Sequence, residues 1–87
     1  MPRKYPPLKR REVIEILKSL GFKFLRQEST HAHYDGLVRG NRHLVTVDTG
    51  YSEFDGDRVK TMIAQSGVTR EEFYGATGAT ARKIGKR

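Results

Sequence analysis

Two histidines spaced two residues apart are the side chains in this sequence best suited to acid–base chemistry. His31 and His33 lie in the stretch 27–35, between one predicted strand and the next. A neutral-range imidazole can take a proton from a hydroxyl and return one to a leaving oxygen. On RNA that hydroxyl is the ribose 2′-OH, which attacks the adjacent phosphate without a metal ion. His31 and His33 are therefore candidate acid–base groups.

Such a reaction also needs cations or donors around the phosphate. Lys23, Arg26 and Arg42 flank the histidines in sequence and could supply the positive charge. Ser29 and Thr30 directly precede His31 and could supply hydroxyl or backbone donors. The neighbouring polar residues thus fit a role in supporting His31.

Two other interpretations of the histidines are open. Histidines on a polar strand face can be exposed, or satisfied by hydrogen bonds, without any chemical role. A metal site would need three or four ligands, and His31, His33, Asp35 and His43 could provide them, but they lack a metal-site spacing. The chain also has no cysteine. We predict neither a metal nor a cofactor.

The positive charge is concentrated at the two ends of the chain. The formal net charge is +7 over 87 residues, yet the segment 12–75 holds all ten acids and only eight of the Lys and Arg residues. Basic ends suggest a polyanionic partner. We predict a basic N-terminal arm over 1–8, a single domain over 9–75 and a flexible basic tail over 76–87. We expect a cytoplasmic protein without membrane contacts, because no apolar run is long enough to span a bilayer.

Hydrophobic periodicity and helix caps predict the order of elements. A helix is expected from Lys9 to Gly21, and a second helix from Asp55 or Asp57 to Gly67. Thr69 and Glu72 form a capping box that predicts a short third helix beginning at Arg70. Three alternating or β-branched segments predict strands at 22–27, 30–35 and 43–47.

The resulting order, α-β-β-β-α with a short extra C-terminal helix, predicts an α+β fold. Short turns favour a three-stranded antiparallel sheet, and two helices covering one of its faces would make a two-layer sandwich. Strand parity puts Ala32 and Tyr34 on one face and His31, His33 and Asp35 on the other. Phe22 and Phe24 share a face on the first strand.

The sequence resembles the HicA toxin family, which consists of small ribonucleases of toxin–antitoxin pairs. The resemblance runs from about Lys9 to Phe73. It rests on the stretches 11–27, 29–34, 45–47 and 59–73. The family's Gly-Ser-His motif is Ser29-Thr30-His31 here, and the segment where many members carry Pro-x-His is Asp48-Thr49-Gly50. The family fold resembles the double-stranded-RNA-binding domain.

The resemblance implies an endoribonuclease that cleaves mRNA with a catalytic histidine, His31, and a HicB-like antitoxin that blocks the site. Ser29, Thr30, His33 and Tyr34 are then candidates for a supporting role. The expected RNA-binding residues are basic: Lys23, Arg26, Arg42, Lys9, Arg10 and Arg11.

Two alternatives belong to other functional classes. The first is a non-catalytic RNA-binding module of the same fold, because double-stranded RNA is recognised by shape and backbone contacts that need no histidine. The second is a protein-interaction domain whose partner covers the histidine face. An RNA-cleavage assay separates the enzyme from both.

Overall fold

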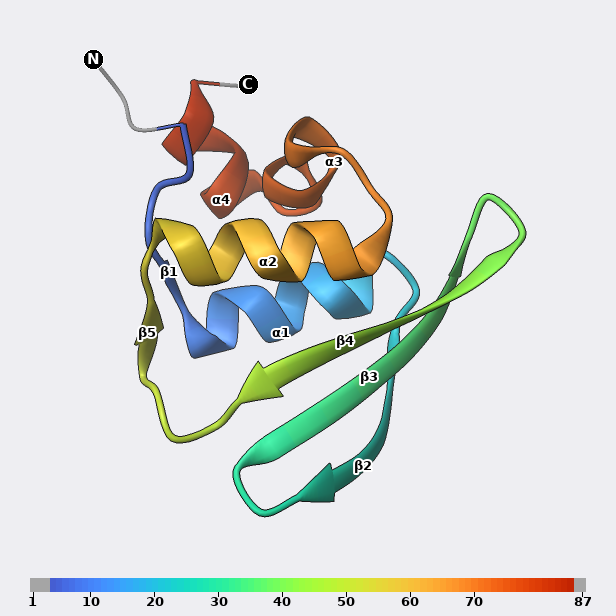
Figure 1. Cartoon of the computed structure of the whole chain (residues 1–87). Helices are drawn as coiled ribbons and strands as arrows, with labels where there is room; N and C mark the ends of the chain where they lie inside the picture. The colour runs from blue at the N-terminus through green and yellow to red at the C-terminus, as the bar shows by residue number, and fades with distance from the viewer. Residues whose placement is uncertain (1–3, 86–87) are drawn as a thin grey trace.

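The computed structural model describes residues 4–85, and Figure 1 shows a three-stranded sheet with helices on one side. The elements, in chain order, are β1 (Leu8–Lys9), α1 (Arg10–Ser19), β2 (Lys23–Glu28), β3 (His31–Val38), β4 (Asn41–Asp48), β5 (Glu53–Phe54), α2 (Gly56–Ser66), α3 (Arg70–Gly75), α4 (Gly78–Ala81) and a 3-10 turn, η1 (Arg82–Ile84). The predicted α+β fold with its order of elements is confirmed.

The main sheet is antiparallel, in the order β2-β3-β4, and a two-stranded ribbon pairs β1 with β5. A two-residue turn at Arg39 and Gly40 joins β3 to β4. Both residues have positive φ, +51° and +83°, as a tight hairpin turn with the twist of the strands requires. The strands on either side are longer than predicted, because the pairing continues up to this turn.

The helices begin and end where their caps predict. Asp55 accepts a hydrogen bond from the N–H of Arg58 at the start of α2, and Gly67 ends that helix with φ +76°. Thr69 and Glu72 form the predicted capping box of α3. These contacts satisfy backbone groups that a helix end leaves without an intrahelical partner.

The core lies between the helices and one face of the sheet. Ala32 and Tyr34 of β3 are buried there, which confirms the predicted strand parity. The remaining buried apolar side chains come from every layer: Leu8, Val13, Ile16, Leu17, Phe22, Val45, Val47, Phe54, Val59, Met62, Ile63, Phe73, Tyr74 and Ala81. Phe24 shares the face of Tyr34, but the helices leave it exposed.

The predicted flexible tail over 76–87 is wrong for residues 76–85. Thr77 caps α4, and the buried hydroxyl of Thr80 donates a 2.6 Å hydrogen bond to the carbonyl oxygen of Tyr74. The predicted arm over 1–8 is also part of the fold, because Leu8 is fully buried and the Tyr74 hydroxyl donates to the carbonyl oxygen of Pro6. The folded unit therefore extends beyond 9–75 at both ends. The basic residues Arg3, Lys86 and Arg87, predicted to belong to the arm and the tail, lie outside the described residues.

No helix within residues 4–85 is both long enough and apolar enough to cross a membrane.

Candidate functional site

His31 begins β3, directly after the two-residue turn that joins β2 to β3. It pairs with Glu28 on β2 and with Asp48 on β4. Ser29, the first turn residue, has φ +56°, a left-handed conformation that glycine adopts more easily than serine. The N–H of Thr49 donates to the carbonyl oxygen of Thr30 at 2.7 Å. These contacts hold the turn, and therefore His31, against the end of β4.

The carboxylate of Asp48 lies next to the His31 ring. His31 Nε2 is 3.8 Å from Asp48 Oδ2, and the His31 side chain is 53% exposed. The backbone N–H of Gly50 donates to Asp48 Oδ1 at 2.9 Å. This hydrogen bond is the main reason that the pKa of Asp48 lies below its ordinary value, and Thr30, His31 and Arg58 lower the pKa further. Asp48 is therefore a charged group that can orient the imidazole or stabilise its protonated form.

The other two histidines have structural partners. His33 is only 14% exposed, and its ring nitrogens lie 3.0 Å from Thr46 Oγ1 and 3.1 Å from Glu28 Oε1. His43 Nδ1 lies 3.2 Å from the carbonyl oxygen of Gln65 at the end of α2. The structure thus distinguishes His31 as the histidine whose ring is open to solvent.

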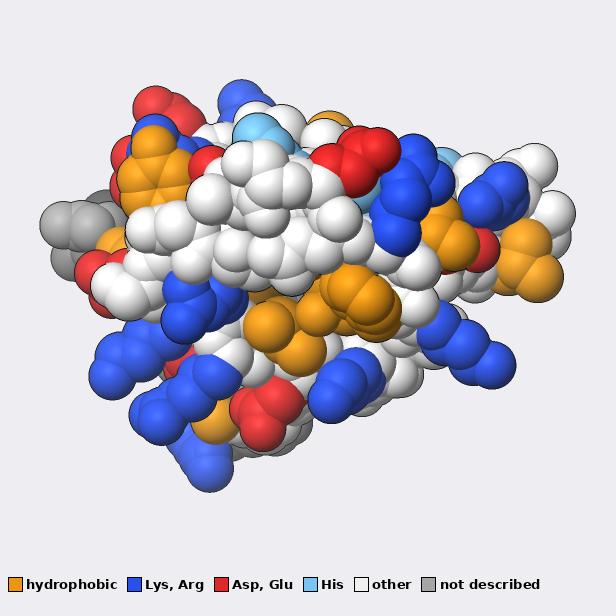
Figure 2. Space-filling model, turned by 90° about the horizontal axis from the view of Figure 1, so that it is seen from below, with side chains coloured by type: hydrophobic (Ala, Val, Ile, Leu, Met, Phe, Trp, Pro, Cys, Tyr) orange, Lys and Arg blue, Asp and Glu red, His pale blue; other side chains and the backbone are white. Residues whose placement is uncertain are grey.

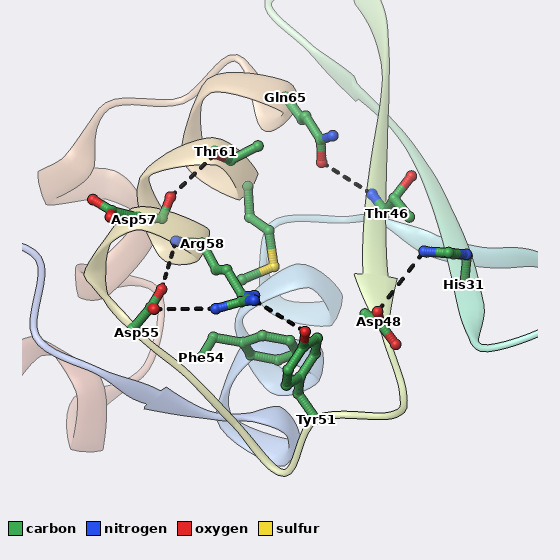
Figure 3. A pocket seen from close by; sticks show the side chains of 11 residues that line it. His31, Thr46, Asp48, Tyr51, Phe54, Asp55, Asp57, Arg58, Thr61 and Gln65 are labelled. Carbon is green, nitrogen blue, oxygen red and sulfur yellow. Dashed lines mark hydrogen bonds and ion pairs between the residues drawn. The ribbon is translucent and has the colours of Figure 1, made fainter.

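His31 lines a cleft of about 590 Å³ between the sheet and α2. Figure 3 shows His31 and Asp48 on one side of this cleft and the first turns of α2 on the other. Tyr51 lies below them, on the loop before β5. The cleft has room for a nucleotide-sized group beside the imidazole.

Arg58 places a guanidinium group in the same cleft. It lies over the Tyr51 ring, 4.3 Å from the ring centroid, and donates to the Tyr51 hydroxyl at 3.0 Å. It also pairs with Asp55 at 3.0 Å. These contacts hold the planar cation in one position. Asp48, Tyr51 and Arg58 were not among the predicted site residues, because only folding brings the segments 48–51 and 55–58 to the histidine.

The predicted RNA-binding cations fall into two groups. Lys23, Arg26 and Arg42 lie on the sheet face that carries His31, since Lys23 is opposite Asp35 and Arg26 is opposite His33. Arg26 pairs with Glu28 at 3.4 Å and Arg42 pairs with Asp35 at 2.7 Å. Both guanidinium groups are largely exposed and accessible to an anion. An anion that binds them would compete with Glu28 and Asp35, and such surface ion pairs are weak.

Lys9, Arg10 and Arg11 lie at the start of α1 and line a smaller cleft of about 270 Å³ with Ile14 and Ser52. The Arg10 side chain donates to the carbonyl oxygens of Thr49 and Tyr51. Its guanidinium group therefore holds the loop beside His31, and its predicted contact with RNA stays a prediction.

The predicted supporting residues do not all face His31. Tyr34 is 7% exposed and lies in the core on the opposite face of the sheet. His33 shares the face of His31, but both of its nitrogens have partners. Thr30 contacts the Asp48 carboxylate, and Ser29 shapes the turn. Among the predicted supporting residues, Thr30 and Ser29 therefore support His31 indirectly, through the Asp48 carboxylate and through the shape of the turn.

Residues 4–85 contain no group of three or more His, Asp or Glu side chains arranged to hold a metal ion.

Comparison with known proteins leaves the family open. No protein-family model matches the chain. No solved structure matches it either.

Proposed function

We propose that this protein is an endoribonuclease of the HicA type, with His31 as its catalytic acid–base group. The observation that carries the proposal is the position of His31. It is the open histidine, it lies beside the charged Asp48, and it lines the same cleft as Arg58. An imidazole, a carboxylate that orients it and a fixed guanidinium group are suited to phosphodiester cleavage.

The reaction begins when His31 takes the proton from a ribose 2′-OH. The O2′ atom then attacks the adjacent phosphorus, and the bond from phosphorus to the 5′-oxygen of the next nucleotide breaks. The products are a 2′,3′-cyclic phosphate and a 5′-hydroxyl. The leaving 5′-oxygen takes its proton from water, and His31 releases the proton it took to water, so that no net proton is consumed. The negative charge that develops on the phosphate oxygens is stabilised by Arg58, already held by Tyr51 and Asp55.

The carboxylates around the cleft set a limit on RNA affinity. Asp48, Asp55 and Asp57 all line the cleft, and Arg58 neutralises only Asp55 directly. Repulsion of the RNA backbone by the other two must be offset by cations outside the cleft, which include Lys23, Arg26 and Arg42. Binding should therefore weaken steeply with added salt.

The biological setting is proposed from the resemblance to the toxin family. The substrate would be mRNA in the cytoplasm, and a HicB-like antitoxin would inhibit cleavage. Because His31 lies at an open cleft, a partner that covers the cleft would exclude RNA without changing the fold.

The test is cleavage of a single-stranded RNA at low salt, with chelator present, by the wild type and by His31→Ala. We expect the substitution to lower the cleavage rate by about 10²- to 10⁴-fold, as loss of an acid–base group does. Circular dichroism should show an unchanged fold, because His31 is half exposed. Equal rates for the two proteins would refute the assignment of His31.

A matched pair on α2 tests the role of Arg58 in the same assay. Arg58→Gln should slow cleavage by about tenfold or more. Lys60→Gln removes the same charge from an exposed position two residues further along the helix and should leave the rate nearly unchanged. Equal effects of the two changes would show that only the net charge matters.

A non-catalytic RNA-binding module is the second candidate, favoured by the exposed cations on the sheet face. It predicts that RNA stays intact, that binding falls with salt, and that His31→Ala binds as tightly as the wild type. The cleavage assay, run with a binding measurement, therefore distinguishes the two functions.

A further inference from the structure

The two edges of the main sheet differ in how they are covered. At the β4 edge, α2 lies alongside, and the side chain of Gln65 accepts the outward N–H of Thr46 at 3.1 Å. At the β2 edge, all six residues of Lys23–Glu28 are exposed. β3 pairs with one side of β2, and no described strand pairs with its outer side. Unpaired N–H and C=O groups on an edge strand are a template for another strand.

The backbone groups that point outward from β2 follow from the register. Hydrogen-bonded and non-hydrogen-bonded pairs alternate along an antiparallel ladder. Because the N–H of Thr46 points away from β3, its partner His33 directs its own backbone groups toward β2. The same alternation along β2 turns the backbone groups of Phe24 and Gln27 outward.

A β-bulge gives this edge an unusual symmetry. Leu25 is the extra residue between the pairs of Phe24 with Tyr34 and Arg26 with His33. Leu25 and Arg26 therefore occupy a single position of the ladder. Phe24 and Gln27 are the neighbours on either side of this position. Their cross-strand partners are Tyr34 and Ala32, so both side chains lie on the helix-facing side of the sheet.

The edge also exposes apolar side chains. Phe24 is 57% and Leu25 is 41% exposed, although Phe24 has an edge-to-face contact with Tyr34. Figure 2 views the molecule from the side on which β2 and its turn lie in Figure 1. It shows hydrophobic side chains in the middle of that face with Lys and Arg side chains around them.

We propose that β2 is a homodimerisation edge that pairs with β2 of a second copy about a two-fold axis through the bulge. Phe24 of each copy is then opposite Gln27 of the partner subunit, and these outward-facing residues form the hydrogen-bonded pairs. The two sheets join into one of six strands in the order β4-β3-β2-β2-β3-β4.

Charge complementarity argues for a second copy of this chain as the partner. In this register, Lys23 of each copy lies opposite Glu28 of the partner subunit, on the outer face of the sheet. Opposite charges therefore meet twice, and both side chains are exposed in the single copy. Arg26 near the axis has its own Glu28 as a partner at 3.4 Å, which reduces the repulsion between the two copies there.

The proposed dimer does not depend on RNA cleavage. The cleft with His31 and Arg58 opens between the sheet and α2, and α2 lies along the β4 edge, so both clefts of the dimer stay open. A monomeric ribonuclease or an inactive dimer would each contradict one proposal and leave the other standing.

The experiment is sedimentation equilibrium of the full chain from about 10 μM to about 1 mM, the range expected for a small interface. Lys23→Glu should raise the dimer dissociation constant by about tenfold, since it puts like charges opposite each other twice. The double variant Lys23→Glu/Glu28→Lys should restore dimerisation. Lys60→Glu, with the same charge change on α2, should not weaken the dimer.

A backbone variant keeps the test independent of charge. Gln27→Pro removes an outward N–H and should abolish dimerisation, whereas Gln27→Ala loses the same side chain and should retain it. A wild type that is monomeric at about 1 mM overturns the proposal. So does a dimer that withstands Gln27→Pro in a variant with unchanged circular dichroism, or a double variant without recovery.

Discussion

At the scale of single residues, the three histidines differ in their exposure and in their hydrogen-bond partners. The sequence presents His31 and His33 as equals on one strand face, and the resemblance to a toxin family selects His31. The structure adds a physical difference: His33 has two hydrogen-bond partners, and His31 has an open ring beside Asp48. Exposure and hydrogen bonding to remote residues made that difference, and neither can be read from the local sequence.

Ser29 supports a prediction about stability at the turn before His31. Its φ of +56° costs an L-residue about 1–2 kcal/mol, whereas glycine loses more backbone entropy on folding, by about 0.5–1 kcal/mol. Ser29→Gly should therefore raise the free energy of unfolding by up to about 1 kcal/mol in urea titrations.

The neighbouring turn residue provides the control. Thr30 is not among the described residues with positive φ, so Thr30→Gly should lower the free energy of unfolding. If Ser29→Gly were less stable than the wild type, the positive φ of Ser29 would not be a source of backbone strain.

At the scale of elements, the helix caps were predictable because they depend on single residues or on pairs three positions apart. Asp55, Gly67 and the Thr69–Glu72 box all have the predicted geometry. The strand β2 was harder to predict. Phe22 and Phe24 were expected on one face, and Phe22 is buried, but Phe24 is exposed because no helix covers the edge of the sheet. Alternation along a strand predicts which face of the sheet a side chain lies on, but it does not predict whether a helix covers that part of the face.

Glu72 links α3 to the β3–β4 turn and gives a prediction about pH. Its pKa lies below the ordinary 4.5, mainly because its carboxylate accepts the N–H of Thr69 and then because Arg39 binds it. Because the pKa of Glu72 is lower in the folded state, its ionised carboxylate stabilises the fold above pH 4.5. This stabilisation is lost as the pH falls through the folded-state pKa. Glu72→Gln should therefore be less stable than the wild type near pH 7, with the gap closing below about pH 4.5.

Thermal unfolding at several pH values measures this gap. Glu15→Gln is the control, since Glu15 is an exposed residue of α1. A Glu72→Gln gap that persists unchanged at pH 3 would show that packing, rather than the charge, is what the substitution removes.

At the scale of the whole molecule, the two ends of the described chain meet. Lys83 donates to the carbonyl oxygen of Pro7 and lies 3.7 Å from Glu12, and Figure 1 shows the segment that leads into β1 passing beside the C-terminal helices. Composition predicted a solvated tail because Ala, Thr and Gly offer little to bury. The structure nevertheless buries Thr80 and Ala81, and the Thr80 hydroxyl donates to the carbonyl oxygen of Tyr74 in α3.

Two truncations test this packing. A chain that ends at Gly75 should lose about 2–3 kcal/mol of stability, because it lacks the buried Ala81, the partly buried Ile84 and the Thr80 hydrogen bond. A chain that ends at Gly85 keeps these contacts and should match the wild type in urea titrations. Equal stability of both truncated chains would contradict a structural role for α4.

Local patterns in the sequence determined the order of helices and strands, the caps and the buried face of β3, because those features depend on neighbours within a few residues. The tertiary structure decided the rest. It brought Asp48 and Arg58 to His31, gave His33 its partners, placed α4 on the core and left β2 uncovered. Each of these depends on contacts between segments far apart in the chain, and side-chain exposure and electrostatics are set only when such segments meet.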